Sequence, residues 1–177
     1  MDSPSQKLMI SLVFCLAVFF SAASASAESV LVRELCRATK VNPECVAALN
    51  SDPRAAKATS HLSLGEIALQ IAAENTTKRQ ELLDQMLVDP NTTSSWKPVL
   101  KTCKAHFETA AMQFSTASRE LGLDAMSANY EVWMASDEIV ACLAFMRSSK
   151  QDIPPLVTSC NYVKTLVSIG DAVTKRL

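Results

Sequence analysis

The chain has 177 residues, a formal net charge of −1, 49% hydrophobic residues and only 3 glycines. A near-neutral charge without a basic stripe argues against nucleic acid as the partner. The 2 histidines leave little material for a metal site or a catalytic dyad. Few glycines and many alanines, leucines and methionines favour helices, and the length predicts one domain.

The first 27 residues have the pattern of a secretory signal peptide. Lys7 precedes the apolar run LMISLVFCLAVFF, and the small residues SAASASA follow it. The run has 13 residues, fewer than the roughly 20 that a membrane-spanning helix needs. We therefore expect cleavage after Ala27, a mature chain that begins at Glu28, and secretion without a membrane anchor.

Secretion determines how the cysteines are interpreted. Cys15 lies in the signal peptide, so five of the 6 cysteines remain in the mature chain: Cys36, Cys45, Cys103, Cys142 and Cys160. An oxidising compartment favours disulfides. An odd number leaves one thiol free or paired with another chain, and four cysteines can pair in three ways.

Four amphipathic helices are predicted after residue 60. The first covers residues 61–87, with Leu64, Ala68, Ile71, Leu82 and Met86 on one side. The second begins near Pro98, which suits a first helical turn. Its apolar residues recur at alternating spacings of three and four: Leu100, Cys103, Phe107, Ala110, Phe114, Ala117 and Leu121.

The second and third helices meet at a short turn. Gly122 is expected to end the second helix in the left-handed cap conformation, and Asp124 to cap the third. The third helix repeats the apolar spacing at Ala128, Val132, Ala135, Ile139, Cys142 and Met146. Met126, Tyr130 and Trp133 are expected to widen its apolar face, and Trp133 is interpreted as a core residue.

The fourth helix covers residues 154–177 and completes an all-α, up-down-up-down four-helix bundle over residues 61–177. Its apolar seam is predicted at Leu156, Cys160, Val163, Val167, Gly170, Thr174 and Leu177, with Leu166, Ile169 and Val173 beside it.

The turn at Gly122 predicts the disulfides. Cys103 lies 19 residues before Gly122 and Cys142 lies 20 residues after it. In an antiparallel hairpin of helices the two cysteines lie at nearly the same height, because each helix rises about 1.5 Å per residue. We therefore pair Cys103 with Cys142. By exclusion Cys36 pairs with Cys45 across a turn at Asn42-Pro43, and Cys160 keeps a free thiol.

No residue pattern indicates an active site. Cys160 is the one candidate nucleophile, with His106 or His61 as a base, but its place on a helix seam favours a small buried side chain. No phosphate-binding loop or metal-ligand spacing is present in the sequence. We expect a protein that is not an enzyme, has no cofactor or metal, and acts as a monomer by binding another molecule.

Two sequons predict glycosylation, at Asn75-Thr76-Thr77 and Asn91-Thr92-Thr93. Asn91 falls in a predicted loop and is the better acceptor. Asn75 falls four residues after Ile71, on the inward side of a straight helix.

The stretch LVRELCRATKVNPECVAALNSDPRAAKA resembles the N-terminal hairpin of the plant invertase and pectin methylesterase inhibitor family. The family pattern is Cys-x-x-Thr, a proline before the second cysteine, a leucine and Ser-Asp-Pro-Arg. It is matched by Cys36, Thr39, Pro43, Cys45, Leu49 and residues 51–54. Phe107 stands four residues after Cys103, where the family usually has tyrosine. The resemblance covers essentially all of the mature chain.

The resemblance implies one inhibitor domain over residues 28–177, with a helical hairpin over residues 28–60 beside the bundle. It also implies a secreted protein of the plant cell wall or apoplast that inhibits a carbohydrate-active enzyme. A bond between Cys36 and Cys45, 9 positions apart, then stabilises a hairpin too small to hold itself, by about 2–3 kcal/mol.

The leading hypothesis is that the protein binds pectin methylesterase non-covalently, one to one, and occludes its cleft. Invertase inhibitors tend to carry Pro-Lys-Phe in the joint between the second and third helices, where this chain reads GLDAMSANYE. Residues expected to face the enzyme lie on those helices: Thr109, Gln113, Thr116, Glu120, Glu131, Asp137 and Glu138. Alternatives are an inhibitor of acid invertase and, more distantly, an extracellular helical bundle that carries a small apolar ligand or acts as a signal.

Overall fold

The computed structural model describes residues 29–177, so the predicted signal peptide and its cleavage site lie outside the described residues. The described part is helical. Its order is α2 (Val30–Arg37), α3 (Asn42–Asn50), α4 (Pro53–Ala56), α5 (His61–Val88), the 3₁₀ turn η1 (Ser94–Trp96), α6 (Lys97–Glu120), α7 (Ala125–Ser148) and α8 (Pro154–Thr174). No helix among these residues is both long and apolar enough to cross a membrane.

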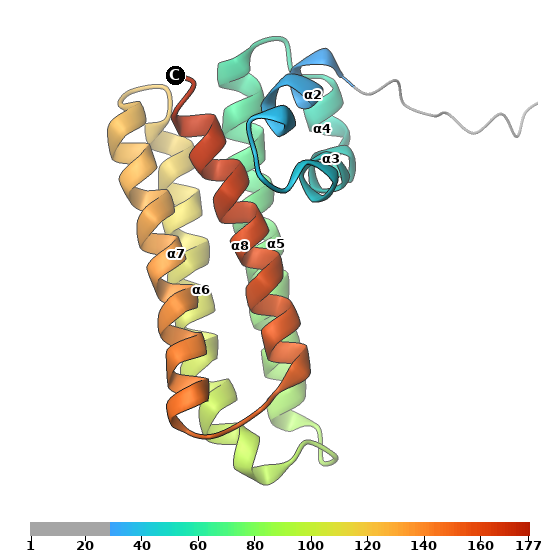
Figure 1. Cartoon of the computed structure of the whole chain (residues 1–177), viewed down its shortest axis with the longest axis vertical. Helices are drawn as coiled ribbons and strands as arrows, with labels where there is room; N and C mark the ends of the chain where they lie inside the picture. Colours follow the sequence, from blue (N-terminus) through green and yellow to red (C-terminus); the bar gives the residue numbers. More distant parts are fainter. Residues whose placement is uncertain (1–28) are drawn as a thin grey trace, which may run out of the picture.

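The four long helices form the predicted up-down-up-down bundle (Figure 1). Each contacts the next along the chain, and α8 returns to contact α5. Two of the four helices start with a side-chain cap, since Ser60 and Ser63 form a capping box on α5 and Asp124 accepts from two backbone amides of α7. The predicted cap at Asp124 is therefore confirmed, as is the first-turn position of Pro98.

The seams of α6 and α7 are confirmed in full. All seven predicted seam residues of α6 are at most 3% exposed, and the six of α7 are at most 6% exposed. The expectation for Gly122 was wrong, because among the described glycines none has a positive φ. The chain leaves α6 through a right-handed turn, in which the Asp124 amide donates to the Glu120 carbonyl at 2.8 Å.

The seams of α5 and α8 differ from the prediction in their second halves. On α5 the buried side passes through Ala72, Thr76 and Leu83, and Leu82 and Met86 are only half-buried. Thr76 fits because its hydroxyl donates to the Ala72 carbonyl at 2.8 Å. On α8, Leu166, Ile169 and Val173 are core residues, whereas Val167 is half-buried and Leu177 is 51% exposed.

The helical hairpin α2–α3, followed by the short α4, packs against α5 and α8 at the end of the bundle where α5 begins (Figure 1). Val32, Cys36 and Cys45 are fully buried at this junction. The predicted bond between Cys36 and Cys45 joins α2 to α3, with Cα atoms 5.5 Å apart. The fold class and both disulfides are therefore as predicted.

The Ser-Asp-Pro-Arg motif connects the hairpin to the bundle. Asp52 caps α4 by accepting from the Arg54 amide at 2.8 Å and pairs with the Arg54 guanidinium at 2.6 Å. The same guanidinium reaches α5, where it lies 2.8 Å from Glu74 Oε1 and 3.1 Å from Gln70 Oε1. The hydrogen bond from Arg54 lowers the pKa of Asp52. The motif therefore orients an arginine that bridges the two parts of the fold.

Candidate functional site

Several of the residues that the sequence placed at the interface lie where α6 and α7 pack together. The bond between Cys103 and Cys142, with Cα atoms 4.8 Å apart, joins the two helices near one end. Nearer the turn, His106 Nδ1 on α6 lies 2.6 Å from Glu138 Oε2 on α7. Both of these side chains are about one quarter exposed. The disulfide and this polar pair hold the two helices at a fixed spacing, so their outer surfaces form one rigid face.

Two further carboxylates lie on these helices, Glu120 on α6 and Glu131 on α7. Burial, and to a smaller extent the charge of Glu120, raise the pKa of Glu131 above its usual value. Oε2 of Glu120 is itself buried and has no hydrogen-bond partner among the described residues. A buried carboxylate oxygen without a donor is costly, and a hydrogen-bond donor from a binding partner would satisfy it. Glu120, Glu131 and Glu138 give this side of the bundle an acidic character.

The other predicted residues lie around these carboxylates. On α6, Gln113 is half-buried, the Thr109 hydroxyl donates to the Ala105 carbonyl at 3.1 Å, and Thr116 accepts from Arg119 at 3.0 Å. Asp137 is exposed, on the outward face of α7. The seven residues are distributed over α6 and α7, four on the first helix and three on the second. We define these residues as the α6–α7 face; its role in binding stays a prediction.

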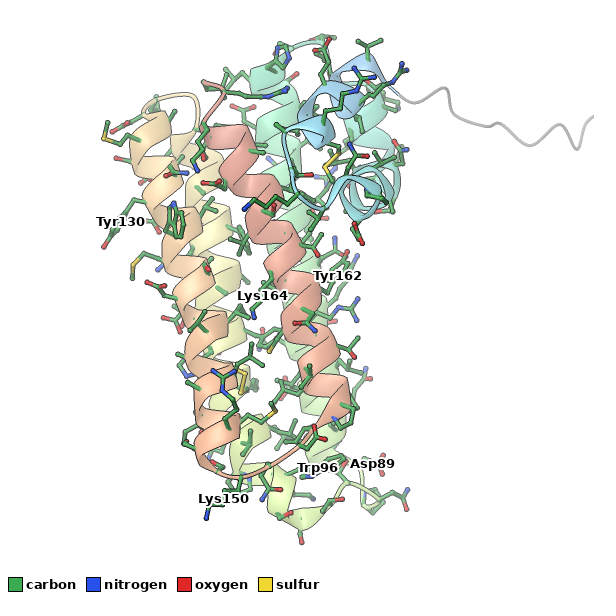
Figure 2. All side chains as sticks on the ribbon, viewed as in Figure 1. Asp89, Trp96, Tyr130, Lys150, Tyr162 and Lys164 are labelled. Carbon is green, nitrogen blue, oxygen red and sulfur yellow. A yellow bond between two sulfur atoms is a disulfide. The ribbon has the colours of Figure 1, made fainter. Side chains whose placement is uncertain are left out.

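The interpretation of the α7 aromatics was wrong. Met126 is 83% exposed, Tyr130 62% and Trp133 53%, so they face solvent and do not widen the core. Figure 2 shows Tyr130 pointing away from the bundle. With Val140, which is 48% exposed, they recur at helical spacing outside the seam of α7. Trp133 comes one residue after the seam residue Val132, so its side chain leaves the helix about 100° round from the seam.

Sequence reasoning missed His106 as a partner of Glu138. The signal was present, because His106 lies 16 residues before Gly122 and Glu138 lies 16 residues after it. Residues at equal distances from the turn lie opposite each other in an antiparallel pair of helices. This height rule, which pairs Cys103 with Cys142, applies equally to His106 and Glu138. The histidine was considered only as a possible catalytic base, whereas its ring is held by the Glu138 carboxylate.

Cys160 is a free and fully buried thiol. Burial raises its pKa to about 12, so the reactive thiolate form is suppressed at neutral pH. Its sulfur lies 3.7 Å from that of Cys142, next to the disulfide. This environment is that of a small apolar core residue and gives no support to a nucleophile.

The two sequons occupy different environments. Asn91 is exposed in the turn after α5. Asn75 is half-buried within α5, its side-chain nitrogen donates to the Ile71 carbonyl at 2.9 Å, and the next residue, Thr76, is fully buried. The folded helix thus hides the nitrogen that would carry a glycan at Asn75. Modification at either site stays a prediction.

Comparisons with known proteins agree with the resemblance that the sequence showed. Residues 30–172 match the model of the family described as plant invertase/pectin methylesterase inhibitor. A search of curated proteins gave no significant match.

Two similar solved structures come from Arabidopsis. The mutant form A of a pectin methylesterase inhibitor is 21% identical, with a TM-score of 0.67 over 84% of this chain and 97% of that one. A pectin methylesterase inhibitor is 22% identical, with a TM-score of 0.57 over 86% and 97%. These likenesses show the shared fold, and the family match covers most of the described residues. The chain belongs to the plant invertase/pectin methylesterase inhibitor family.

Proposed function

We propose that this protein inhibits pectin methylesterase by binding it non-covalently, one to one, with the α6–α7 face covering the active-site cleft. The observation that carries the proposal is the row of carboxylates on this face, namely Glu120, Glu131 and Glu138, with the polar residues beside them on α6. De-esterified pectin is a chain of carboxylates and hydroxyls. A rigid helical face with the same groups is suited to a cleft that binds such a chain.

The exposed apolar residues of α7 support a protein partner. Tyr130 and Met126 lie on the same helix as Glu131 and Glu138 and are 62% and 83% exposed. Exposed aromatic side chains bordered by charges are typical of protein interfaces, where they bury large areas at a small entropic cost. We place the protein in the plant cell wall as a secreted monomer, because its N-terminal sequence has the signal-peptide pattern and it has two disulfides.

The proposal is tested by methanol release from methyl-esterified pectin. The oxidised protein, from residue 28 onward, is added to a plant pectin methylesterase at ratios from below to above equimolar. We expect activity to fall to a plateau near one equivalent and a 1:1 complex on size exclusion. Unchanged methanol release at a several-fold excess over several plant isoforms would refute the proposal.

Two charge reversals locate the interface. Asp137→Lys changes an exposed side chain, so the fold is expected to survive, and Glu138→Lys changes the half-buried carboxylate that contacts His106. Each is expected to weaken inhibition by roughly tenfold or more, as charge reversal in an interface usually does. Glu81→Lys, on the exposed side of α5, is the matched control and should inhibit like the unmodified protein.

Acid invertase is the second candidate target, since the family name covers both enzymes. The turn between α6 and α7 has no Pro-Lys-Phe, which favours the esterase. Sucrose hydrolysis by a cell-wall invertase, measured with the same protein preparation, distinguishes the two targets. Inhibition of invertase alone would reassign the target and leave the fold argument intact.

A further inference from the structure

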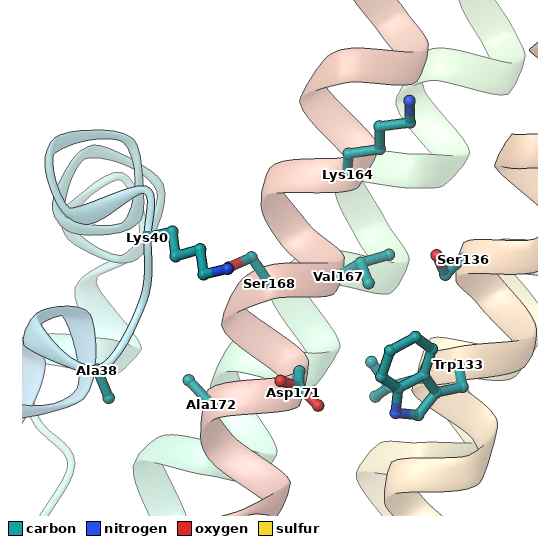
Figure 3. A pocket seen from close by; sticks show the side chains of 10 residues that line it. Ala38, Lys40, Trp133, Ser136, Lys164, Val167, Ser168, Asp171 and Ala172 are labelled. Atoms are coloured by element: carbon teal, nitrogen blue, oxygen red, sulfur yellow. The ribbon is translucent and has the colours of Figure 1, made fainter.

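A pocket of about 370 Å³ lies between α7, α8 and the loop that follows α2 (Figure 3). It is separate from the α6–α7 face, because its lining residues come from α7, α8 and the hairpin loop and none comes from α6. Trp133 and Ser136 line it from α7, Lys164, Ser168 and Asp171 from α8, and Lys40 from the hairpin loop. Its volume is in the range of pockets that hold small ligands.

Trp133 gives the pocket one apolar wall. The indole is 53% exposed, although the seam behind it is filled. The flat face of an indole carries partial negative charge, which attracts the weakly positive C–H groups of a saturated ring. Val132 and Val167 add apolar surface beside it. An exposed tryptophan in a pocket, rather than on a convex surface, is suited to a ring stacked against it.

The charges of the pocket favour an anion. Neither Lys40 nor Lys164 makes an ion pair with another described residue, and both side chains are exposed. The one carboxylate of the pocket is already balanced, since Asp171 accepts from Lys175 at 2.7 Å and from Asn129 at 3.2 Å. Lys40 and Lys164 therefore bring two uncompensated positive charges to the lining of the pocket, and each can make a charge-assisted hydrogen bond to a carboxylate.

The hydroxyls supply the remaining recognition groups. Ser136 and Ser168 line the pocket from opposite helices, and within residues 29–177 their hydroxyls have no hydrogen-bond partner. Each is therefore free to donate and to accept. A stacking face, two cations and two free hydroxyls match one ligand class best: a pyranose that carries a carboxylate. An acidic peptide would satisfy the lysines but would leave the indole and the serines without partners.

We propose that this pocket binds an acidic sugar of the uronate class, with its carboxylate at Lys40 and Lys164 and one ring face on Trp133. Ser136 and Ser168 bond to the ring hydroxyls. Binding here holds the protein on a polymer of uronates independently of any enzyme. The proposal goes beyond the proposed function and does not rest on it, and the assay below contains no enzyme.

Lys40 gives the ligand a second effect. It belongs to the hairpin, whereas the other charged lining residues belong to α8, so the pocket is complete only when the hairpin is docked. A ligand that bridges the two parts must stabilise the docked state by linkage. Backbone amides near Lys40 should therefore exchange hydrogen more slowly when the ligand is bound.

The test is calorimetric titration of the oxidised protein with tri-galacturonic acid at low ionic strength. Two probes of similar size separate the contributions: maltotriose has the rings without the charge, and tri-glutamate has the charges without the rings. We expect tri-galacturonate to bind with a Kd on the order of 0.1–1 mM, and the other two to bind at least tenfold more weakly. Hydrogen exchange of residues 36–41 should slow with tri-galacturonate alone.

Matched variants assign the contacts. Trp133→Ala is expected to weaken binding roughly three- to tenfold, and Lys40→Gln with Lys164→Gln by tenfold or more. Tyr130→Ala removes another exposed aromatic of α7, and Lys57→Gln with Lys101→Gln removes two exposed charges elsewhere; both should bind like the unmodified protein.

Three results would overturn the proposal. The first is that tri-galacturonate does not bind at 10 mM, far above the expected Kd on the order of 0.1–1 mM. The second is that tri-glutamate binds equally well and Trp133→Ala has no effect, which would make the pocket a charged patch for an acidic protein. The third is that the control variants lose as much affinity as the pocket variants. Thermal melts establish that each variant is folded.

Discussion

Nδ1 of His106 lies 2.6 Å from Oε2 of Glu138, and this contact crosses from α6 to α7 beside the face that we propose covers the esterase. It is the polar counterpart of the disulfide between Cys103 and Cys142, which joins the same two helices. The two connections make the spacing of α6 and α7 a fixed property of the fold. A rigid face loses little entropy on binding, which favours affinity.

The pair should contribute measurably to stability. His106→Ala and Glu138→Gln, alone and together, form a double-mutant cycle measured by urea denaturation. We expect a coupling energy of about 0.3–1 kcal/mol, because the pair is well aligned but about a quarter exposed. A coupling energy of zero within error would mean that the contact only follows from the packing of the helices.

Glu131 predicts a dependence of stability on pH. Burial raises its pKa above the usual 4.5, so the folded state holds this proton more tightly than the unfolded state. The contribution of Glu131 to the free energy of unfolding is therefore fully present below pH 4.5, the pKa of the unfolded state. It is lost as the pH rises through the pKa of the folded state. Glu131→Gln should remove the loss, so that the variant gains stability relative to the unmodified protein at pH 7 but not at pH 4.

The measurement is the free energy of unfolding at both pH values. Glu81→Gln, on the exposed side of α5, is the control. Its stability relative to the unmodified protein should differ less between pH 7 and pH 4 than that of Glu131→Gln. If Glu131→Gln gains no more stability over the unmodified protein at pH 7 than at pH 4, then water solvates the Glu131 carboxylate better than its burial indicates.

Arg54 should control how tightly the hairpin is docked. Arg54→Ala removes the guanidinium that bonds Asp52 of the hairpin to Glu74 and Gln70 of α5. The buried contacts of the hairpin remain, so we expect local opening rather than unfolding, with a cost of about 1 kcal/mol because these bonds are partly exposed. Hydrogen exchange within residues 30–50 should accelerate roughly fivefold, as that free energy implies.

Lys57→Ala is the control for this experiment, because Lys57 is exposed and lies outside the bridge. Exchange in α6 and α7 should stay unchanged in both variants. Equal exchange in the hairpin of Arg54→Ala and of the unmodified protein would assign the docking to the apolar contacts alone.

The helices that the sequence predicted best are those whose seams contain only apolar or cysteine side chains. On α6 and α7 the period alone determined which residues are buried, and the height rule then placed Cys103 opposite Cys142. On α5 the apolar period did not predict that Thr76 is buried, because a polar residue is not counted as a core residue. Thr76 can nevertheless occupy a core position, since its hydroxyl bonds to a carbonyl of its own helix. On α8 it failed where the hairpin covers a second side of the helix.

The candidate site was less predictable than the fold. The carboxylates of the α6–α7 face were proposed from a family resemblance, and the equal distances of His106 and Glu138 from Gly122, which predict their contact, were not used. Trp133 was assigned to the core because large apolar residues usually lie inside. Its exposure follows from its place on the helix, because Trp133 comes one residue after the seam residue Val132 and therefore lies about 100° round the helix from it.

The free thiol of Cys160 predicts an alternative disulfide. Its sulfur lies 3.7 Å from that of Cys142, so Cys142 has a second partner within reach when Cys103 is absent. In Cys103→Ser, secreted under oxidising conditions, we expect Cys142 to pair with Cys160 and to link α7 to α8. Peptide mapping without reduction should find that link, and the free-thiol titre should fall to zero.

Cys103→Ser with Cys160→Ser is the matched control, because no second partner remains for Cys142. Closing the 18-residue loop between Cys142 and Cys160 should make the single variant more stable than the double variant by about 3 kcal/mol in the chain-entropy model. Equal stability, or a thiol at Cys160 that stays reduced, would show that the core holds the Cys160 sulfur in place too firmly for the bond to form. In the unmodified protein the thiol should resist alkylation at pH 8, since burial raises its pKa to about 12.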